Sequence, residues 1–369
     1  MDDRKALARQ IFANTLAGID IPATLAQKLH LCDGVIQAGD AEVNLRAYRE
    51  IVAIAMGKAA VALAEGLTAV LAPEFRVRGI LAGPTKPSHT LDGWKTFVAG
   101  HPVPNEESFR AGRAILELLR GCSEKTLIFF LLSGGGSSLV ELPLDENISL
   151  SDFVKLHHAL VTCGAPIEEI NAIRKHLSAV KGGRLAAAAP QAMKLTFGVT
   201  DVPEGQESAL ASGPTLPDPT TIADAERVAR EYHLLDKLPA SLRTKFEQHA
   251  LVETPKPGDP AFARAQFELL LGRRDLFHHA HVATEAAGFL TVCDNATDGW
   301  SVEKATQHLL GQLDAISRSF DGKPVALIVD GEVSSPVMGK GIGGRNSAFV
   351  LACVEKIAGR KITVLSAGT

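Results

Sequence analysis

A lysine stands where a predicted strand gives way to a helix. The apolar run Glu50–Met56 predicts a strand, and Gly57 and Lys58 follow it directly. In open α/β sheets, ligands bind outside the carboxyl ends of the strands, where an ammonium group can meet phosphate or developing negative charge. A lysine near a helix N-terminus is unfavourable because both are positive, and this penalty favours a function for Lys58. A solvated first-turn lysine is the alternative.

A glycine-rich loop follows another apolar strand, predicted over residues 126–132. Its sequence is Ser133-Gly134-Gly135-Gly136-Ser137-Ser138. Glycines let backbone N–H groups approach an anion closely, and serines add hydroxyl donors. The loop lacks the GxxxxGK[ST] pattern of a P-loop. It favours binding of phosphate or substrate, with a simple tight turn as the alternative.

A second glycine-rich stretch covers residues 339–346 and satisfies GxGxxG. A dinucleotide ribose would need an acidic residue about twenty positions on, and the interval offers only Glu355, in the wrong part of a helix. We therefore reject a Rossmann NAD site here. What remains is a flexible loop that places Lys340 and Arg345 at a helix start. The planar fork of Arg345 suits phosphoryl oxygens, and a hairpin with solvated cations is the alternative.

Four cations fall within residues 174–184, namely Arg174, Lys175, Lys181 and Arg184. Arg174 and Lys181 are seven residues apart and share one face if the segment is helical. Such a cluster could hold a substrate carboxylate or nucleotide phosphates. A solvated helix face is the more common meaning of a charge run, and His176 by itself indicates a structural role.

Acidic residues at strand ends are the candidates for Mg²⁺. Asp201 follows a predicted strand over 194–200, and Asp330 and Glu332 follow one that begins at Val325. Mg²⁺ needs only one or two carboxylates besides phosphate oxygens, and we select Asp201 and Glu332. No HxxxH, HExxH or cysteine cluster is present, and five scattered cysteines indicate reduced thiols.

The elements that must position these residues alternate along the chain. Continuous apolar runs predict strands covered on both faces, hence parallel sheets with helices on each side. The predicted strands are 50–56, 77–82, 95–99, 126–132, 194–200, 267–272, 289–293, 325–330 and 362–366. The predicted helices are 58–72, 106–121, 150–163, 273–287, 302–320 and 346–358, and residues 2–31 predict one or two more. The pattern indicates an α/β protein of two doubly wound domains with mostly parallel sheets and an interdomain cleft.

The domain boundary is predicted from composition. Three prolines lie between Pro255 and Pro260, and they cannot extend a helix or a central strand. We expect a larger Rossmann-like domain over 1–240 and a smaller α/β domain over 241–369.

Composition excludes several classes of protein. The 369 residues are 46% hydrophobic and 22% charged, which is typical of a globular chain. The net charge of −4 offers no basic excess for nucleic-acid binding. No apolar stretch approaches the roughly 20 residues of a membrane helix, and the N-terminus lacks a signal-peptide core. A cytoplasmic protein without nucleic-acid or membrane partners is expected.

These segments, in this order, resemble the bacterial glycerate 2-kinase family, whose C-terminal half is called the MOFRL region. The resemblance spans nearly the whole chain from about residue 50. The matching stretches are 57–60 (GKAA), 100–104 (GHPVP), 132–138 (LSGGGSS), 174–178 (RKHLS), 180–185 (VKGGRL), 200–203 (TDVP), 211–215 (ASGPT), 217–221 (PDPTT), 253–259 (ETPKPGD), 339–341 (GKG), 343–346 (GGRN) and 366–369 (SAGT).

The resemblance implies ATP-dependent phosphorylation of D-glycerate at its 2-hydroxyl, with Mg²⁺, and two α/β domains with the site in the cleft between them. It implies catalytic roles for Lys58 and Arg345. We expect these two cations, far apart in the sequence, to neutralise charge on the same transferring phosphoryl group. Glycerate and ATP are the expected partners, and a homo-oligomer stays open.

The sequence departs from the family pattern in two places. Relatives usually continue past residues 366–369 into an acidic DGxDGPTDAAG stretch, so the smaller domain is expected to be incomplete. The usual SGGE turn reads Asp330-Gly331-Glu332. Two alternatives remain, a hydroxypyruvate reductase and a non-catalytic ligand-binding relative.

Overall fold

The computed structural model describes residues 2–39, 41–72, 74–202, 205–320, 322–335 and 343–368. The chain divides into two compact units. The larger unit is Ile21–Gly272, and the smaller unit combines Met1–Asp20 with Arg273–Thr369. Each unit is described by itself.

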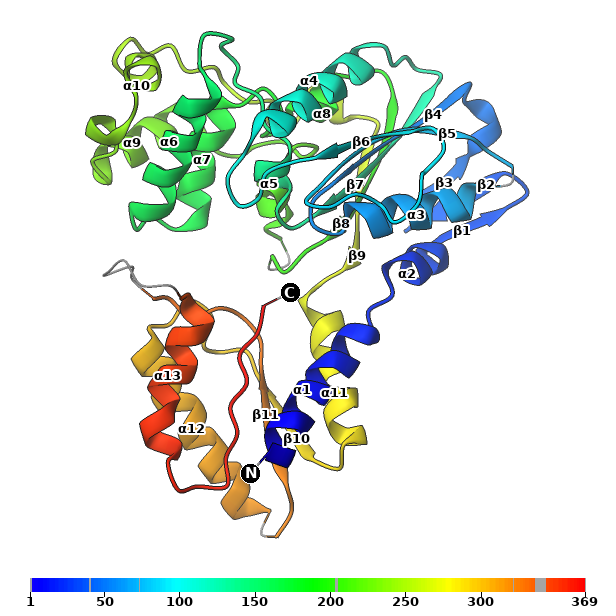
Figure 1. Ribbon diagram of the computed structural model, residues 1–369. Coiled ribbons are helices and arrows are strands. Elements are labelled where there is room, and N and C mark those ends of the chain that lie inside the picture. Colours follow the sequence, from blue (N-terminus) through cyan, green and yellow to red (C-terminus); the bar gives the residue numbers. More distant parts are fainter. Residues whose placement is uncertain are drawn as a thin grey trace. The chain divides into compact units, whose positions relative to one another are not determined.

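A six-stranded parallel sheet with the order β6-β5-β4-β7-β8-β9 forms the centre of the larger unit (Figure 1). Its strands are β4 (Glu50–Met56), β5 (Val77–Gly83), β6 (Trp94–Val98), β7 (Thr126–Ser133), β8 (Met193–Val199) and β9 (Ala265–Leu271). The chain runs outward from β4 to β6, then returns to β7 on the other side of β4 and continues to β9. The order of the strands therefore reverses between β4 and β7, and such a switch point is where open α/β sheets bind ligands.

The central strands are buried because helices cover both faces of the sheet. All eight residues of β7 are buried, as are six of the seven in β4. Ile54 and Phe130 are paired across the two strands and belong to one core cluster with Ile115 and Leu119 of α4 (Glu106–Arg120). The continuous apolar runs of the sequence thus correspond to strands without a solvent face.

A second core lies among helices beside the sheet. Residues of α6 (Leu150–Thr162), α7 (Ile167–Leu177), α9 (Ile222–Glu231) and α10 (Ala240–Glu247) pack together (Figure 1). Phe109 of α4 meets Phe153 of α6 edge to face, with ring centroids 5.9 Å apart. The same contact ties this helical group to the sheet layer.

The remaining elements of the larger unit are short. They are α2 (Ile21–Lys28), β1 (Leu29–Cys32), β2 (Val35–Ala38), β3 (Ala41–Asn44), α3 (Ala60–Leu71), α5 (Gly136–Leu139), α8 (Arg184–Ala187) and 3₁₀ turns at Leu45–Ala47, Glu207–Ser212, Leu235–Lys237 and Pro260–Phe262. Strands β1, β2 and β3 form a separate antiparallel sheet, where the sequence predicted helix up to residue 31 and no strand.

The smaller unit is built on two parallel strands, β10 (Leu290–Asp294) and β11 (Val325–Val329). Its helices are α1 (Asp2–Ala17), α11 (Arg273–Ala286), α12 (Val302–Ser319) and α13 (Arg345–Ile357). Helix α1 packs on α11, and α12 packs on α13. The N-terminal helix and the C-terminal part of the chain thus share one unit.

The division of the chain differs from the predicted boundary at residue 240. The strand predicted over 267–272 pairs with β8, so it is the sixth strand of the larger sheet rather than part of the second domain. The proline-rich segment is also fastened to the larger unit, since Asp218 N donates to Pro255 O at 2.9 Å. Prolines exclude this segment from helix and strand, but they do not make it a linker.

The α/β class and the parallel sheet of the larger unit are confirmed. In the described part of the smaller unit the sheet consists of β10 and β11, which are parallel, and a doubly wound arrangement of this unit stays a prediction. The predicted strand over 362–366 lies in the described part and forms no strand.

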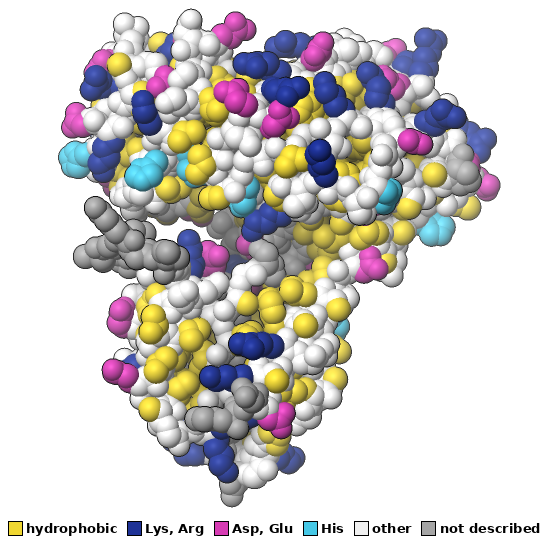
Figure 2. All heavy atoms as spheres, in the orientation of Figure 1, with side chains coloured by type: hydrophobic (Ala, Val, Ile, Leu, Met, Phe, Trp, Pro, Cys, Tyr) yellow, Lys and Arg dark blue, Asp and Glu magenta, His cyan; other side chains and the backbone are white. Residues whose placement is uncertain are grey.

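No helix in the described ranges is long and apolar enough to cross a membrane. On the face drawn in Figure 2, Lys and Arg side chains are interspersed with Asp and Glu over the larger unit.

Candidate active site

The first two predicted sites meet at the switch point. Gly57 ends β4 with φ +124°, and a Cβ on it would lie 2.1 Å from Ser133 Oγ. Lys58 N donates to Gly134 O at 2.8 Å, and Ala59 N donates to Ser133 Oγ at 3.0 Å. The turn after β4 therefore runs directly against the turn after β7. Lys58 itself is exposed at this edge of the sheet.

The serines of this loop are engaged in holding its shape. Ser133 Oγ accepts from Ala59 N and donates to Met56 O at 3.5 Å. Ser212 donates to Asn171 at 3.0 Å, so its 2.8 Å contact with Ser137 uses the proton of the Ser137 hydroxyl. The sequence predicted hydroxyl donors for a ligand, and the structure shows these protons already donated within the protein.

The contact between Ser137 and Ser212 also braces a strained segment. Ala211 and Ser212 have φ of 51° and 62°, a region that non-glycine residues rarely adopt. Each such residue costs on the order of 1–3 kcal/mol. The surrounding bonds offset this strain, so the loop and the segment after β8 are built as one structure.

Backbone N–H groups are the remaining donors of the loop. Gly135 has φ +84° and precedes α5, whose first-turn N–H groups have no intrahelical acceptor. Among the described residues, the N–H groups of Gly135, Gly136 and Ser137 donate no hydrogen bond. Anion-binding capacity therefore lies in the main chain of the loop.

A cavity of about 140 Å³ opens beside the same loop. Its polar lining is formed by His101, Ser137, Ser138, Glu141, His157 and Arg174. A Cβ on Gly135 would lie 3.1 Å from His101 Nδ1 and 3.3 Å from Lys58 Cγ. The glycine therefore lets both side chains flank the loop closely, one from the segment after β6 and one from the turn after β4.

Burial, together with nearby positive charge, controls the ionisation of the cavity's histidines. Partial burial and the charge of Lys58 lower the pKa of His101, and burial together with Arg174 lowers the pKa of His157 to about 4. Burial also lowers the pKa of Arg174, against the opposing effect of Glu141. Arg174 Nη2 lies 3.3 Å from His157 Nδ1, which must accept because a guanidinium only donates. Near pH 7 the cavity thus holds neutral histidines and one cation.

The other cations of residues 174–184 do not line this cavity. Lys181 is 1% exposed, and its Nζ lies 2.6 Å from Glu141 Oε2. Arg184 donates to Val252 O at 2.9 Å and to Glu253 O at 3.2 Å. A direct contact of Lys181 with a ligand, as the sequence predicted, is therefore replaced by a buried ion pair that holds Glu141.

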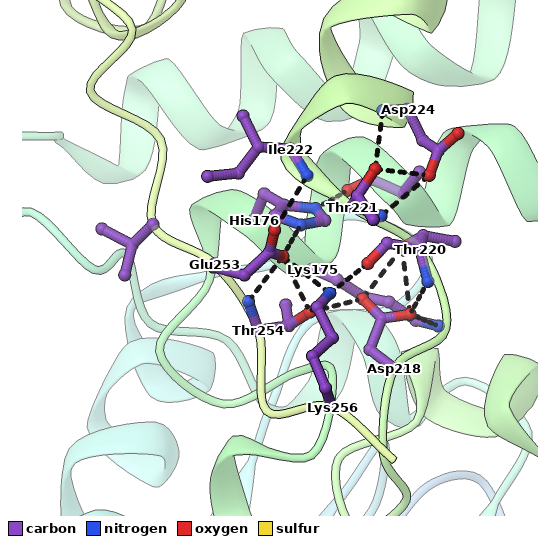
Figure 3. A network of polar contacts seen from close by, with 12 residues as sticks. Lys175, His176, Asp218, Thr220, Thr221, Ile222, Asp224, Glu253, Thr254 and Lys256 are labelled. Atoms are coloured by element: carbon purple, nitrogen blue, oxygen red, sulfur yellow. Dashed lines mark hydrogen bonds and ion pairs between the residues drawn. The ribbon is translucent and has the colours of Figure 1, made fainter.

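Lys175 belongs to a second buried network (Figure 3). Its Nζ lies 3.0 Å from Asp218 Oδ1, and the two side chains are 4% and 0% exposed. Thr254 Oγ1 donates to Asp218 Oδ2 at 3.0 Å. Burial alone would raise the pKa of Asp218, and Lys175 outweighs it, so that the pKa is lowered. This network fixes α7 to the segment after residue 250.

His176 and Glu253 extend the same network (Figure 3). His176 Nε2 lies 2.9 Å from Glu253 Oε1, and Nδ1 lies 2.7 Å from Ala172 O. Burial alone would raise the pKa of Glu253, but hydrogen bonds from Lys256 and His176 outweigh it and lower the pKa to about 2. The structural role predicted for His176 agrees with these contacts.

In the smaller unit, Arg345 is the first residue of α13 and forms an ion pair with Glu332. Arg345 and Glu332 therefore contact each other, although Arg345 was predicted to bind a phosphate and Glu332 to bind a metal ion. Nearby, Arg273 Nε donates to Asp330 Oδ2 at 2.7 Å. Lys340, and residues 339–342 of its loop, lie outside the described residues.

The two predicted metal ligands differ in availability. Asp201 is exposed just beyond β8 and forms no ion pair within the described ranges. Glu332 already neutralises Arg345. No group of three metal-ligating side chains occurs among the residues with described positions. Asp201 alone fits a cation that takes most of its ligands from phosphate and water.

Comparisons with known proteins agree with this architecture. A sequence model of a family described as a domain of unknown function, DUF4147, matches residues 7–247. The D-glycerate 2-kinase of Thermotoga maritima is 34% identical over 326 residues, which cover 86% of this chain and 75% of that enzyme. The chain belongs to the glycerate 2-kinase family.

Two further proteins are similar to this member of the glycerate 2-kinase family. A putative hydroxypyruvate reductase of Agrobacterium vitis is 35% identical over 317 residues, covering 84% of this chain and 69% of that protein. The crystal structure of a glycerate kinase from Thermotoga maritima matches with a TM-score of 0.75 at 30% identity, covering 98% of this chain and 82% of that one. The family predicted from the motifs is confirmed.

Sequence reasoning missed three polar residues of the cavity, His101, Glu141 and His157. His101 belongs to the GHPVP segment, and its place just after a predicted strand is the same signal that selects Lys58. Glu141 and His157 carry no such signal, because their place in the cavity depends on how α5 and α6 pack.

Proposed function

We propose that this chain transfers the γ-phosphoryl group of ATP to the 2-hydroxyl of D-glycerate, giving 2-phosphoglycerate. The observation that carries the proposal is the juxtaposition at the switch point, where Lys58 and the free N–H groups around Gly135 adjoin a cavity containing Arg174. Family membership adds the substrate, since relatives at this level of identity are named for glycerate phosphorylation.

Phosphoryl transfer depends on positioning and on neutralising charge. In our proposal Lys58 stabilises the transferring group, and the backbone N–H groups of Gly135 and Gly136 bind phosphate oxygens. Mg²⁺, when bound, neutralises part of the charge on the phosphates. Asp201 would hold it, because its carboxylate is exposed at the carboxyl end of β8 and has no competing cation among the described residues.

Hydroxypyruvate reduction is the second candidate, favoured by the name of the Agrobacterium vitis relative. A nicotinamide cofactor at this sheet would call for the GxGxxG fingerprint in the turn after β4. That turn continues as Gly57-Lys58-Ala59-Ala60-Val61-Ala62, with alanine at both further glycine positions. The first βα turn therefore favours a kinase.

The deciding experiment offers the purified protein two substrate pairs. ADP release that requires both D-glycerate and MgATP, with 2-phosphoglycerate identified by ³¹P NMR, is the expected result. Oxidation of NADH by hydroxypyruvate without ADP release would replace the kinase by the reductase. Binding of either substrate without turnover would leave a ligand-binding protein.

We also propose that Arg345 acts in the same step as Lys58, from the smaller unit. Residues that act as a unit on one transition state give strongly non-additive losses. The variants Lys58→Met and Arg345→Gln and the double variant should therefore have similar kcat values. Losses that multiply in the double variant would show that Arg345 contributes independently. A cytoplasmic location and a homo-oligomer stay predictions.

A further inference from the structure

His101 occupies a position from which it can reach both the loop and the cavity. It follows β6 at the carboxyl edge of the sheet and is exposed at the cavity. Its Nδ1 lies 2.9 Å from Ser138 Oγ. This is the only hydrogen bond of the ring among the described residues, so Nε2 stays available to a ligand.

The hydrogen bonds of Ser138 favour one tautomer of His101. Ser138 Oγ donates its single proton to Gly135 O at 3.2 Å. The same oxygen must then accept from His101, so Nδ1 carries the imidazole proton. In the neutral ring the lone pair consequently lies on Nε2, the nitrogen that makes no contact with the protein.

The groups that face His101 keep the ring neutral and provide a binding cation. Lys58 flanks it from the turn after β4. Glu141 lines the same cavity from the segment after α5, and His157 and Arg174 line it from α6 and α7. Partial burial and, after it, the charge of Lys58 lower the pKa of His101. Glu141 is neutralised by Lys181, and Arg174 is the cation among the residues that line the cavity.

The cavity has the size of a small organic acid. Its volume of about 140 Å³ is close to the roughly 150 Å³ of an engineered protein cavity that binds benzene. A three-carbon hydroxy acid fits this volume. Its carboxylate would meet a guanidinium, the group best shaped to bind it.

We propose that this cavity holds the acceptor hydroxy acid, with its carboxylate on Arg174 and its hydroxyl proton accepted by Nε2 of His101. The inference rests on the proposed function. The hydroxyl oxygen forms a bond to the γ-phosphorus as the bond from that phosphorus to the β–γ bridging oxygen breaks and ADP leaves. The hydroxyl proton passes to Nε2, giving an imidazolium that releases it to solvent once the product has left.

His101→Asn is the variant that isolates the base. Its amide nitrogen can replace Nδ1–H as donor to Ser138, while the lone pair of Nε2 is lost. Loss of a general base lowers kcat by roughly 10²–10⁴-fold. Wild-type kcat/KM should fall on the acidic side as His101 protonates, below the usual histidine pKa of about 6.5, and this limb should be absent in His101→Asn.

Two variants serve as controls. His158→Asn removes an exposed histidine on α6 outside the cavity and should leave kcat and the pH profile unchanged. Arg174→Gln should raise KM for D-glycerate at least tenfold with KM for ATP little changed. A similar rise in both KM values would overturn the assignment of the cavity to the acceptor.

Each outcome distinguishes this inference from the proposed function. A wild-type protein without glycerate-dependent ADP release would overturn both. Wild-type turnover with the acidic limb retained in His101→Asn would overturn the role of His101 alone. Should His101→Asn fail to fold, as seen by circular dichroism, a wild-type kcat/KM without an acidic limb at any pH at which the enzyme stays folded would equally refute it.

Discussion

Replacing Lys181 by methionine should destabilise the larger unit without abolishing binding of nucleotide. Lys181 and Glu141 have side chains 1% and 7% exposed, and Nζ and Oε2 are 2.6 Å apart. Methionine keeps most of the length of lysine and removes the charge. Glu141 then stays buried without a cation, although its Oε1 still accepts from Ser178 at 2.5 Å and from Leu142 N at 3.0 Å.

The size of the effect follows from what remains bonded. Breaking a buried ion pair by removing one partner costs about 3–5 kcal/mol. Because Glu141 keeps two hydrogen bonds, we expect the lower end, ~3 kcal/mol. A unit of this size loses roughly 2–4 °C of Tm per kcal/mol, so the midpoint should fall by about 6–12 °C.

A double-mutant cycle with Glu141→Gln checks the physical cause. Glutamine keeps an oxygen acceptor for Ser178 and Leu142 and carries no charge. The single variant Glu141→Gln leaves the ammonium of Lys181 buried without a counter-ion and should also be destabilised. The double variant should recover most of the loss, with a coupling energy of roughly 2–3 kcal/mol from urea unfolding curves.

The opposite result would restore the interpretation of Lys181 as a residue that contacts the bound nucleotide. Suppose that the free energy of unfolding of Lys181→Met lies within ~0.5 kcal/mol of wild type and that its Kd for ATP rises tenfold or more. The main role of Lys181 would then be to bind nucleotide and not to form the buried ion pair. Isothermal titration calorimetry at a temperature well below both Tm values separates the two outcomes.

The other predictions test the switch point and the network of Figure 3. Lys58→Met should lower kcat by roughly 10²–10³-fold, whereas Lys125→Met, exposed at the opposite end of β7, should leave it unchanged; equal loss in both would refute the role of Lys58. Gly57→Ala places a Cβ 2.1 Å from Ser133 Oγ, so we expect insoluble or strongly destabilised protein, and a normal Tm would contradict the close approach. Hydrogen bonds from Lys256 and His176 outweigh burial and lower the pKa of the Glu253 carboxyl to about 2 in the folded protein, against an ordinary value of 4.5. Its lowered pKa contributes stability above pH 4.5 that is lost as the pH falls toward 2, so the stability advantage of wild type over Glu253→Gln should shrink between pH 6 and pH 3 in urea titrations, and a constant difference would refute the assignment.

Much of the larger sheet could be predicted because its strands are buried on both faces. The run Glu50–Met56 was predicted with the bounds that β4 has, since its six buried positions after Glu50 are all apolar. The strands β1, β2 and β3 were missed because they are four residues long and half exposed. The boundary at residue 240 failed for a different reason, since pairing between β8 and β9 is a long-range contact that no local pattern encodes.

Those residues of the candidate site that directly follow a strand could be predicted from the sequence. Lys58 and the loop at 133–138 each follow a buried strand, and this alone marks them for the carboxyl edge of a sheet. Their adjacency depends on strand order, because β5 and β6 come between β4 and β7 in sequence and not in space. The partner of Lys181 is forty residues away in the sequence, so the spacing of the cations around Lys181 could not distinguish an ion pair from a ligand site.

The hydroxyl groups show why residue types alone overstate a phosphate loop. Serine offers one proton, and in this loop Ser133, Ser137 and Ser138 donate theirs to Met56 O, Ser212 and Gly135 O. Those bonds hold the turn in the shape that leaves the backbone N–H groups of Gly135 and Gly136 without acceptors. The same bond from Ser138 places the lone pair of His101 on Nε2. The serines therefore contribute to ligand binding through the main chain and the imidazole that they orient, and a substitution among them should alter the chemistry even where no ligand touches the hydroxyl.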